Sequence, residues 1–407
     1  MDIHNKVMRL AVVAVIALGL AVWAGRSRQP QETLPAAQVA VAGLAEGINQ
    51  VDRIALVGAE SKPIATLERT PAGWTVAERS GYAADVAKVR EFLLKLADAT
   101  LLEAKTAMPE SYARLGVQDV AAKDAPGVEV SIGGLGEPLK LIVGNFNGRG
   151  GEGTFVRRAG EAQSWLAKGN LTVDKLTANW LRRDLVDLPS SRIAAVEITT
   201  DGKTLRAFRD DPAQTDFQVA NLPRGRELSS PAAANGLASA LTGLRFDDVL
   251  PAAGVAPGAA TVHALRYIAF DGLLVNGEAW SADGKDLARF SASLDEAAAS
   301  AAIEREQAAA RSAFEAQKAA ADAQALADAE ARAKDPNAAV ATPPAAPEPP
   351  LAVSDPTKDR EQRLAALRQE AADLDARFKG WVFVLPNYKF ANMNKTVDEL
   401  LKPLDPK

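Results

Sequence analysis

The chain has 407 residues, no cysteine and a formal net charge of −5, with 47% hydrophobic and 24% charged residues. This composition is that of a globular protein, so wholesale disorder is excluded, and the lack of cysteine excludes disulfides, thiolate metal sites and cysteine nucleophiles. The acidic balance gives no support for a nucleic-acid partner.

The N-terminus carries the one long apolar run. Leu10–Gly25 is uninterrupted apolar and glycine sequence between basic residues, and as a helix it would measure about 24 Å. Flanking residues bring it close to the ~30 Å of a hydrocarbon core. We therefore predict a membrane anchor over residues 1–28, with a cleaved signal peptide or a buried core helix as alternatives. A Pro/Ala/Gln-rich linker over residues 29–47 follows.

Residues 48–189 predict a first α+β unit. A helix from residue 86 would place Val86, Val89, Leu93 and Leu96 on one face, and a second helix is expected around 177–185. Alternating apolar residues predict strands, several of them as hairpins, at 53–57, 64–69, 73–77, 128–132, 139–143, 154–158 and 164–167.

The same pattern returns about 139 residues later. Arg53-Ile-Ala-Leu-Val57 resembles Arg192-Ile-Ala-Ala-Val196, and Leu115-Gly-Val117 resembles Ala253-Gly-Val255. Gly134 corresponds to Gly272, where Asp271-Gly272 is a hairpin turn signal. A second α+β unit is therefore predicted over residues 190–295.

The second unit also has a predicted helix after its first strands. Ser230 is placed to cap this helix, with Pro231 at its first position. Leu237, Ala240 and Leu241 would form its apolar face, together with Leu244.

The last hairpin of the second unit is interrupted. Residues 296–380 are an Ala/Glu-rich stretch, a Pro-rich linker and a helix whose apolar residues follow a heptad seam, namely Leu364, Leu367, Ala371, Leu374 and Phe378. The missing strand appears only at Trp381–Leu385, and a terminal helix to Leu401 completes the unit over 381–407. We predict a coiled-coil-like helical arm inserted at a hairpin tip. A solvated hairpin of helices is favoured over a dedicated partner-binding coiled coil, and its antiparallel pairing would cover only part of the first helix.

Candidate chemistry is sparse. Gly148-Arg-Gly-Gly-Glu-Gly153 matches G-x-G-x-x-G, but a strand pattern follows it where a dinucleotide site needs a helix. With His4 near the N-terminus, His263 is the remaining histidine, and no Gly-x-Ser-x-Gly elbow offers it a nucleophile. We interpret His263 as structural, and we predict no metal site, cofactor site or catalytic residue.

Paired carboxylates are the other candidates, and we favour structural roles for all of them. They occur at Asp184/Asp187, Asp210/Asp211 and Asp247/Asp248; neighbours on a strand point to opposite faces, and Asp210-Asp-Pro is typical of a turn. The tryptophans of the body are interpreted as core residues, and the basic pairs Arg157-Arg158 and Arg182-Arg183 as solvated.

Several features together resemble one bacterial family, the domain-of-unknown-function-4340 family. They are the short anchor, the Gly73-Trp74 strand, Val143-Gly144 with its glycine-rich loop, Trp180-Leu-Arg-Arg-Asp-Leu-Val-Asp-Leu-Pro189 and the closing Trp381-Val-Phe-Val-Leu-Pro-Asn-Tyr388. The similarity covers roughly residues 10–295 and 381–405. It implies a membrane-anchored, mostly extracytoplasmic protein without assigned catalytic residues, in some cases found alongside ABC-type transport components.

The sequence therefore predicts an α+β fold of two similar units, each with an antiparallel sheet and packed helices, with an N-terminal transmembrane helix and an inserted arm. We expect a single-pass protein of the bacterial inner membrane with a periplasmic body. Two basic residues flank each end of the anchor, so the positive-inside rule favours this orientation only slightly. The expected function is non-catalytic, as an accessory or scaffold component of a transporter-type or other envelope assembly. Its expected partners are the lipid bilayer and other envelope proteins. The alternatives are a periplasmic glycan or small-ligand binding module and, third, a carboxylate-based hydrolase.

Overall fold

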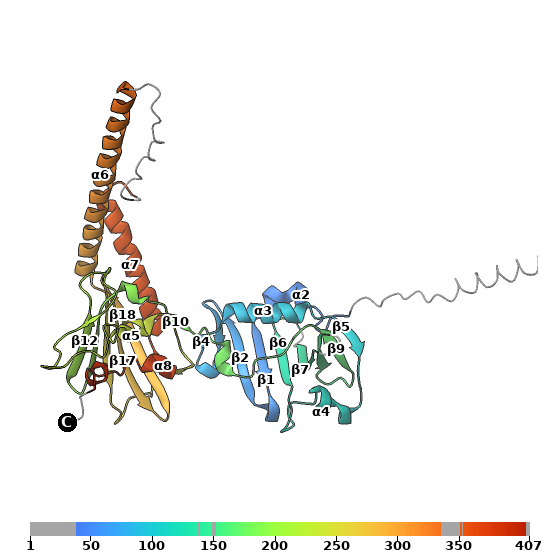
Figure 1. Ribbon diagram of the computed structural model, residues 1–407. Helices are drawn as coiled ribbons and strands as arrows, with labels where there is room; N and C mark the ends of the chain where they lie inside the picture. The colour runs from blue at the N-terminus through green and yellow to red at the C-terminus, as the bar shows by residue number, and fades with distance from the viewer. Residues whose placement is uncertain (1–37, 137–138, 149–151, 335–350, 352, 404–407) are drawn as a thin grey trace, which may run out of the picture. The chain divides into compact units, whose positions relative to one another are not determined.

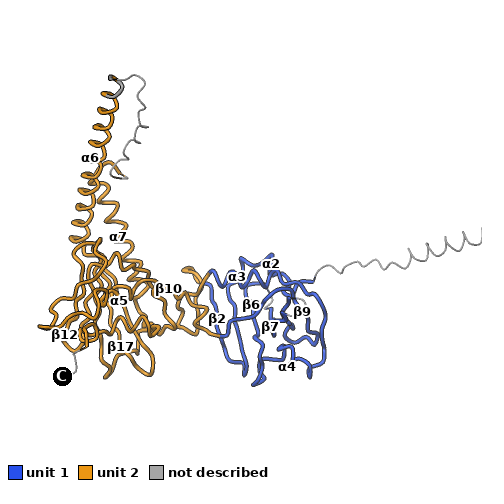
Figure 2. The backbone as a smooth tube through the Cα atoms, in the orientation of Figure 1, with its two compact units in different colours: residues 1–69, 87–175 blue, residues 70–86, 176–407 orange. Residues whose placement is uncertain are grey.

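The computed structural model describes residues 38–136, 139–148, 152–334, 351 and 353–403. The chain divides into unit 1, residues 1–69 and 87–175, and unit 2, residues 70–86 and 176–407 (Figure 2). The predicted anchor over 10–25 lies outside the described residues. Within the described part, we find no helix that combines the length and the hydrophobicity required to cross a membrane.

Unit 1 is built on an antiparallel sheet with the strand order β2-β1-β6-β7-β8-β9-β5 (Figure 1). The bounds are β1 Arg53–Val57, β2 Pro63–Thr70, β5 Leu101–Ala104, β6 Val128–Gly133, β7 Leu139–Asn147, β8 Gly153–Arg158 and β9 Ser164–Lys168. The helices of this part of the chain are α2 Leu44–Gly47, α3 Val86–Ala97 and α4 Tyr112–Leu115. The predicted pairings of 128–132 with 139–143 and of 154–158 with 164–167 are confirmed by the ladders β6–β7 and β8–β9.

Alternation along the strands decides which side chains enter the core of unit 1. In β6, Val128, Val130 and Ile132 are buried while the residues between them stay half-exposed, as the period of two in a strand requires. Helix α3 adds Phe92 and other apolar residues to this core. The prediction that Val86 belongs to its buried face is wrong: Val86 is 54% exposed, because it lies at the first helical position, one turn before the core begins.

Unit 2 repeats this sheet. Its strand order is β13-β12-β11-β16-β17-β18-β19-β15, in which the strands from β12 to β15 repeat the order of unit 1 with each number raised by ten. The bounds are β11 Ile193–Thr200, β12 Lys203–Phe208, β13 Gln218–Val219, β15 Asp248–Pro251, β16 His263–Ala269, β17 Leu273–Ala282, β18 Lys285–Leu294 and β19 Trp381–Val384. In both units the strand that precedes the central meander in sequence (β5 or β15) lies at the far edge, so the meander fills the middle of the sheet.

The glycines that marked the repeat occupy equivalent backbone conformations. Gly116 and Gly254 have φ of 74° and 88°, and Gly134 and Gly272 have 88° and 83°. A Cβ at Gly134 would lie 2.2 Å from the Gln50 carbonyl oxygen. These values favour glycine on both steric and conformational grounds.

A loop packs over the meander in each unit. In unit 1, Val117 and Tyr112 form a buried cluster with Ile142. In unit 2, Val255 packs against a cluster that includes the fully buried Trp280. The repeated Gly-Val pair therefore begins an equivalent covering segment in both units.

One hairpin belongs to unit 2 although it precedes most of unit 1 in the sequence. It consists of β3 Gly73–Val76 and β4 Tyr82–Ala83. The ring of Tyr82 packs edge-on against Phe246, Trp381 and Phe383 at centroid distances of 5.4, 4.9 and 6.3 Å. Burial raises the pKa of Tyr82 to about 12. Residues far apart in the sequence thus share one aromatic cluster in unit 2.

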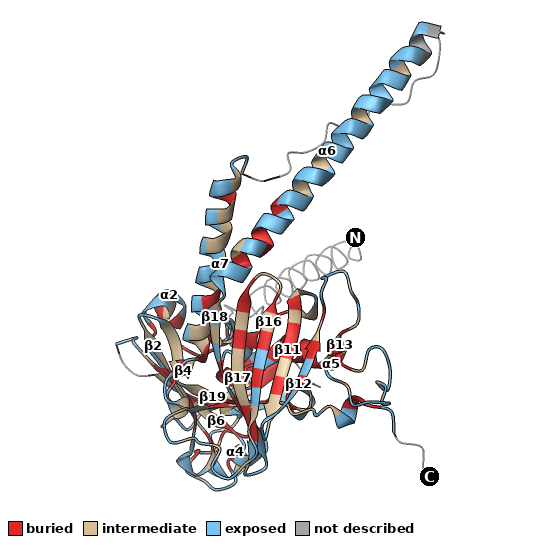
Figure 3. Ribbon diagram, turned by 90° about the vertical axis from the view of Figure 1, so that its left-hand side faces the viewer, coloured by how far each residue is buried: buried red, intermediate tan, exposed pale blue. Residues whose placement is uncertain are grey.

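The arm lies between β18 and β19, which pair with each other. It comprises α6 Glu296–Lys334 and α7 Pro356–Phe378, the latter capped by Asp355, whose side chain accepts from Thr357 N and Lys358 N. The C-terminal part of the α7 seam faces the sheet. Ala371, Leu374 and Phe378 are buried there, and the ring centroids of Phe378 and of Phe290 in β18 are 5.6 Å apart. Most of α6 is exposed along its length (Figure 3).

Three predicted helices differ from the structure, and the one around 177–185 is wrong. Around 177–185 the chain forms one 3-10 turn, Thr177–Trp180, and the strand β10 Asp184–Val186, because pairing with β14 Leu244–Arg245 and burial of Leu181 and Leu185 outweigh the local helical spacing.

The other two helices are shorter than predicted. Residues 231–234 are turns and α5 starts at Asn235, whose side chain is tied to Asp216 and to Phe217 N. It continues in a 3-10 turn, Ser239–Leu241, with Leu237, Ala240 and Leu241 buried as predicted. The terminal helix to Leu401 is reduced to α8 Asn387–Phe390 and a 3-10 turn, Asp398–Leu400.

Candidate functional site

The predicted acid pairs do not converge on shared clefts. Asp247 accepts from Arg183 at 2.9 Å, whereas Asp248 accepts from Arg79 at 2.6 Å. Their carboxylates therefore serve different arginines on different segments, as adjacent strand residues would. Such engaged carboxylates stabilise the fold of unit 2.

Three further acids of these pairs are also engaged. Asp184 pairs with Arg245 at 3.0 Å across β10 and β14, and Asp187 accepts from Gly243 N at 2.7 Å. Asp211 accepts from Ala213 N at 2.7 Å within the turn that the sequence indicates.

His263 is the first residue of β16 and is partly buried. Its Nδ1 lies 2.7 Å from the Thr200 hydroxyl, and its ring is edge-on to Phe390. Burial lowers the pKa of His263, while the charges of Asp201 and Glu399 oppose this shift. A cavity of about 280 Å³ close to this pair is lined by residues of the β11–β12 hairpin and of segment 395–398.

The glycine-rich loop joins two strands. β7 ends at Asn147 and β8 begins at Gly153, while residues 149–151 lie outside the described part. The strand predicted after the motif is confirmed as β8, whereas a dinucleotide fingerprint requires a helix N-terminus at that point.

The tryptophans divide into two groups. Trp180 and Trp280 are fully buried, whereas Trp74, Trp165 and Trp381 are partly exposed. Neither of the two cavities described here is lined by a tryptophan.

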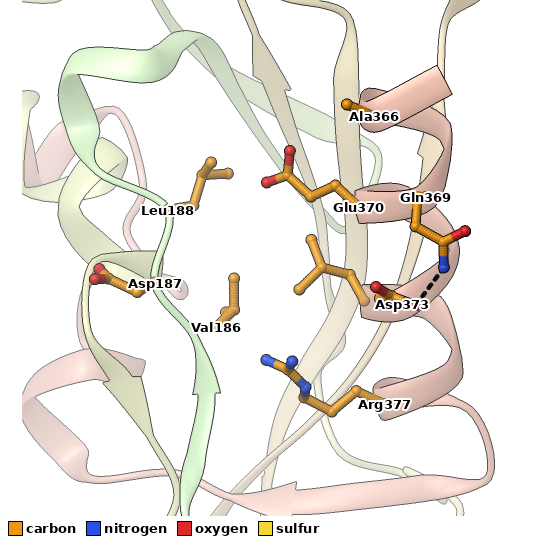
Figure 4. A pocket seen from close by; sticks show the side chains of 9 residues that line it. Val186, Asp187, Leu188, Ala366, Gln369, Glu370, Asp373 and Arg377 are labelled. Carbon is orange, nitrogen blue, oxygen red and sulfur yellow. Dashed lines mark hydrogen bonds between the residues drawn. The ribbon is translucent and has the colours of Figure 1, made fainter. Parts of the chain in front are cut away.

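The larger cavity, of about 520 Å³, lies in unit 2 between the segment after β10 and helix α7. Its apolar lining comes from Val186, Leu188 and Leu374, which are buried. Figure 4 shows Glu370 and Arg377 extending from α7 toward the 186–188 segment. Asp187, Gln369, Asp373 and Ala366 complete the lining.

Glu370 and Arg377 of this cavity, together with Arg192 and Asp271 outside its lining, hold α7 in place. Both carboxylate oxygens of Glu370 accept from Arg192, at 2.6 and 2.8 Å, and Arg192 also donates to Asp271 at 2.5 Å. The hydrogen bonds to Glu370 are the main cause of the raised pKa of Arg192. Arg377 donates to the Leu185 carbonyl at 2.9 Å. We call these four side chains, Arg192, Asp271, Glu370 and Arg377, the arm brace.

Sequence reasoning missed the arm brace. Arg192 and Glu370 are 178 residues apart, and no local pattern joins them. The sequence signal that points to the arm brace is the repeat. Arg192 corresponds to Arg53, but only the second unit carries an arm, so the two arginines have different surroundings. Among the described residues, we find no group of three or more histidines or carboxylates placed to hold a metal ion.

A second set of contacts joins the two helices of the arm. Glu296 is bound by Arg368 at 2.6–2.7 Å, Glu304 by Arg360 at 2.5 Å, and Glu306 by Arg363. Near the start of α7, Gln307 donates to Asp359 at 2.7 Å and to the Pro356 carbonyl. The residues of α6 after Gln307 therefore extend about 40 Å beyond the start of α7. We call residues 308–334 the distal arm.

A family model matches residues 74–262, and its description is a domain of unknown function, DUF4340. The match is narrower than the similarity expected from the sequence, and it includes Arg192 and the 186–188 wall of the larger cavity but not the arm. No curated protein and no solved structure matches the chain.

Proposed function

The chain belongs to the DUF4340 family through residues 74–262, and from this premise we propose that it is a non-catalytic, membrane-anchored envelope protein. In this proposal it is an accessory or scaffold component of a transporter-type or other cell-envelope assembly of the bacterial inner membrane. The Leu10–Gly25 run is its single membrane span, and the two units form a periplasmic body.

The arm carries this proposal. A short turn between β18 and β19 would be enough to complete the second sheet. In this chain, however, residues 296–380 lie between these two strands. The arm brace and four interhelical contacts hold the root of the arm against unit 2. A helix fixed at one end and exposed along the rest presents a long surface at a defined place, which suits docking of another protein.

The hydrogen-bond partners of the cavity carboxylates support a scaffold role rather than an enzymatic one. The carboxylates of the larger cavity are engaged by arginines, a backbone N–H or a glutamine. Nucleophilic or acid–base catalysis needs a group that is held within reach of substrate and free to exchange a proton. A glycan-binding module would be expected to show a cavity lined by several tryptophans, and the two cavities described here have none.

Co-purification from membranes tests the proposal. The full chain is isolated in mild detergent beside a variant in which residues 308–354 are replaced by a short Gly/Ser loop. Gln307 and Pro356 are in contact, so such a loop can close without disturbing the arm brace. We expect envelope proteins to co-purify with the full chain and to be lost from the variant.

The matched control removes charge from unit 2 without touching the arm. Arg206 and Arg266 both pair with Glu197 on an exposed face of the sheet, and the double substitution to alanine should retain all partners. If the full chain purifies alone, or if its partners persist without the distal arm, the proposed scaffold role of the arm is wrong.

A further inference from the structure

Two charged side chains of the larger cavity lack a partner of opposite charge in the part of the chain that the structure describes. They are Asp373 and Arg377 of α7. Arg377 donates to the Leu185 carbonyl at 2.9 Å, which uses one of the five N–H groups of a guanidinium. Asp373 is exposed and accepts from the Gln369 side-chain amide through one carboxylate oxygen, at 2.8 Å. Both charges are therefore open to a ligand in the cavity.

Helix α7 places these charges on one wall of the cavity. Asp373, Leu374 and Arg377 follow Glu370 at three, four and seven positions, and residues at these spacings lie on one side of a helix. Along the helix axis, Asp373 is about 6 Å and Glu370 about 10 Å from Arg377. Glu370 is still 39% exposed although it binds Arg192. This wall therefore carries negative charge toward one end and a cation at the other, with Leu374 between them.

The facing wall is apolar. Val186 and Leu188 are buried and two positions apart in extended chain, so their side chains share one side of it. Figure 4 shows both on the side that faces α7, whereas Asp187 is turned away and accepts from Gly243 N. Leu188 N donates to the Leu241 carbonyl at 3.1 Å, which holds the segment in place. The cavity thus has one fixed apolar wall and one charged wall.

These walls indicate a ligand with two opposite charges and an apolar middle. The volume of about 520 Å³ suits a small molecule. A single amino acid is too short, because its ammonium and carboxylate groups are carried by the same carbon. A peptide of two or three residues with free termini extends about 7–11 Å, which matches the separation of Arg377 from Asp373 and Glu370.

We propose that the larger cavity binds a short peptide with free termini and an apolar side chain. Its ammonium group lies at Asp373 and Glu370, its carboxylate group binds Arg377, and its side chain packs on Val186 and Leu188. The proposal goes beyond the scaffold role and does not depend on the membrane anchor. A peptide bound there contacts the root of the arm and the 186–188 segment at the same time.

Calorimetry with matched peptides tests the proposal on the full chain in mild detergent. The probe is the tripeptide Ala-Leu-Ala with free termini. Its N-acetyl form lacks the ammonium charge, its C-terminal amide lacks the carboxylate, and Ala-Ser-Ala lacks the apolar side chain. We expect each of these three changes to weaken binding by at least about tenfold, because each removes a charge-assisted contact or an apolar one.

Two neighbouring substitutions on α7 locate the site. Ala365 and Ala366 are both exposed, but only Ala366 lines the cavity. Ala366→Phe places a ring in the cavity and should abolish binding of Ala-Leu-Ala. Ala365→Phe is the matched control and should bind within about twofold of the unchanged chain. In the unchanged chain, the peptide should slow hydrogen exchange of residues 366–377.

A second pair of variants tests the ammonium contact while leaving the arm brace intact. In Asp373→Asn, acetylation of the peptide should weaken binding by at most about threefold, because the charge that it would remove has lost its partner. Glu361→Gln removes an exposed carboxylate of α7 outside the cavity lining and should retain the full cost of acetylation.

Three results overturn the proposal. They are equal affinity for the free and the blocked peptides, binding that survives Ala366→Phe, and no binding of Ala-Leu-Ala up to about 5 mM. The scaffold role is tested separately by co-purification, so either proposal can fail while the other stands.

Discussion

The two units share the order of their equivalent strands but differ in the connection between the last two strands of the meander. Unit 1 joins β8 to β9 through residues 159–163, whereas unit 2 joins β18 to β19 through residues 295–380. The order of the equivalent strands is nevertheless the same. A sheet of this kind tolerates a large insertion at a hairpin tip because the paired strands, and not the connection, carry the ladder.

Two equivalent arginines, Arg53 and Arg192, differ in whether they contact the arm. Arg53 in unit 1 makes a loose pair with Glu68 at 3.6 Å, and both side chains are about half exposed. Its counterpart Arg192 is 24% exposed and binds Glu370 of the arm and Asp271 of the sheet. The same position thus serves as a solvated surface residue in one unit and as the anchor point of the arm in the other.

The largest expected effect concerns the root of the arm. Phe378 is 1% exposed and packs against Phe290. Phe378→Ala leaves a cavity there and should destabilise unit 2 by about 3–5 kcal/mol. Leu326→Ala, on the distal arm and 65% exposed, should change stability by less than about 0.5 kcal/mol. Denaturant unfolding and hydrogen exchange of β18 measure both, and equal effects would contradict the division into a packed root and a solvated distal arm.

The repeated glycines test whether the two units share the same constraint. Gly134→Ala and Gly272→Ala each combine a positive φ with a backbone oxygen 2.2 or 2.6 Å from the new Cβ. Each should cost about 2–4 kcal/mol in its own unit. Gly284→Ala has a φ of 71° but open space around the Cβ and should cost only about 1 kcal/mol. Unit-resolved hydrogen exchange distinguishes these outcomes, and a silent Gly134→Ala would argue against the equivalence.

The arginine pair sharpens the comparison further. Arg192→Ala leaves Glu370 and Asp271 without their partner and should cost about 2–3 kcal/mol in unit 2. Arg53→Ala removes an exposed pair and should cost at most about 1 kcal/mol in unit 1. Thermal unfolding compares them, with Arg192→Lys as a variant that keeps charge but loses the bidentate contact. Similar costs for the two alanine variants would remove the distinction.

The smallest expected effect is a pH dependence confined to unit 2. Burial lowers the pKa of His263 from 6.5, so between that value and the lower folded pKa the unfolded chain binds more protons. The stability of unit 2 should therefore be fully present above pH 6.5 and fall as the pH drops through the folded pKa.

Unit 1 has no histidine between residues 38 and 175 and should lack this slope. His263→Gln should abolish it in unit 2, as unfolding measured from pH 7.5 to 5 would show. A slope that survives this substitution would assign the pH dependence to another group.

Local patterns predicted much of the fold. Alternating residues predicted β1, β2, β6, β7, β8 and β9 and the equivalent strands of unit 2, because a half-buried strand leaves a period of two in the sequence. Turn-forming glycines marked equivalent positions of the repeat. The placement of a helical arm before the last strand followed from composition, since alanine favours helix and proline interrupts it.

Long-range contacts decided what local patterns could not. The edge positions of β5 and β15 were not predicted, and the spacing of Leu181 and Leu185 suited a helix although pairing with β14 made the second of them part of a strand. The heptad spacing of α7 is typical of a helix–helix seam, whereas Leu374 and Phe378 are buried and Phe378 packs against Phe290 of β18. Short segments take the structure that their partners stabilise, and those partners are distant in sequence.

By itself, the sequence determined a twice-repeated α+β chain with an interruption in its last hairpin, because periodicity and turn chemistry are properties of neighbouring residues. Only the tertiary structure decided that Arg192 and Glu370 meet and that α7 packs on β18. These features join residues across large sequence separations, and only the folded sheets bring such residues within contact distance.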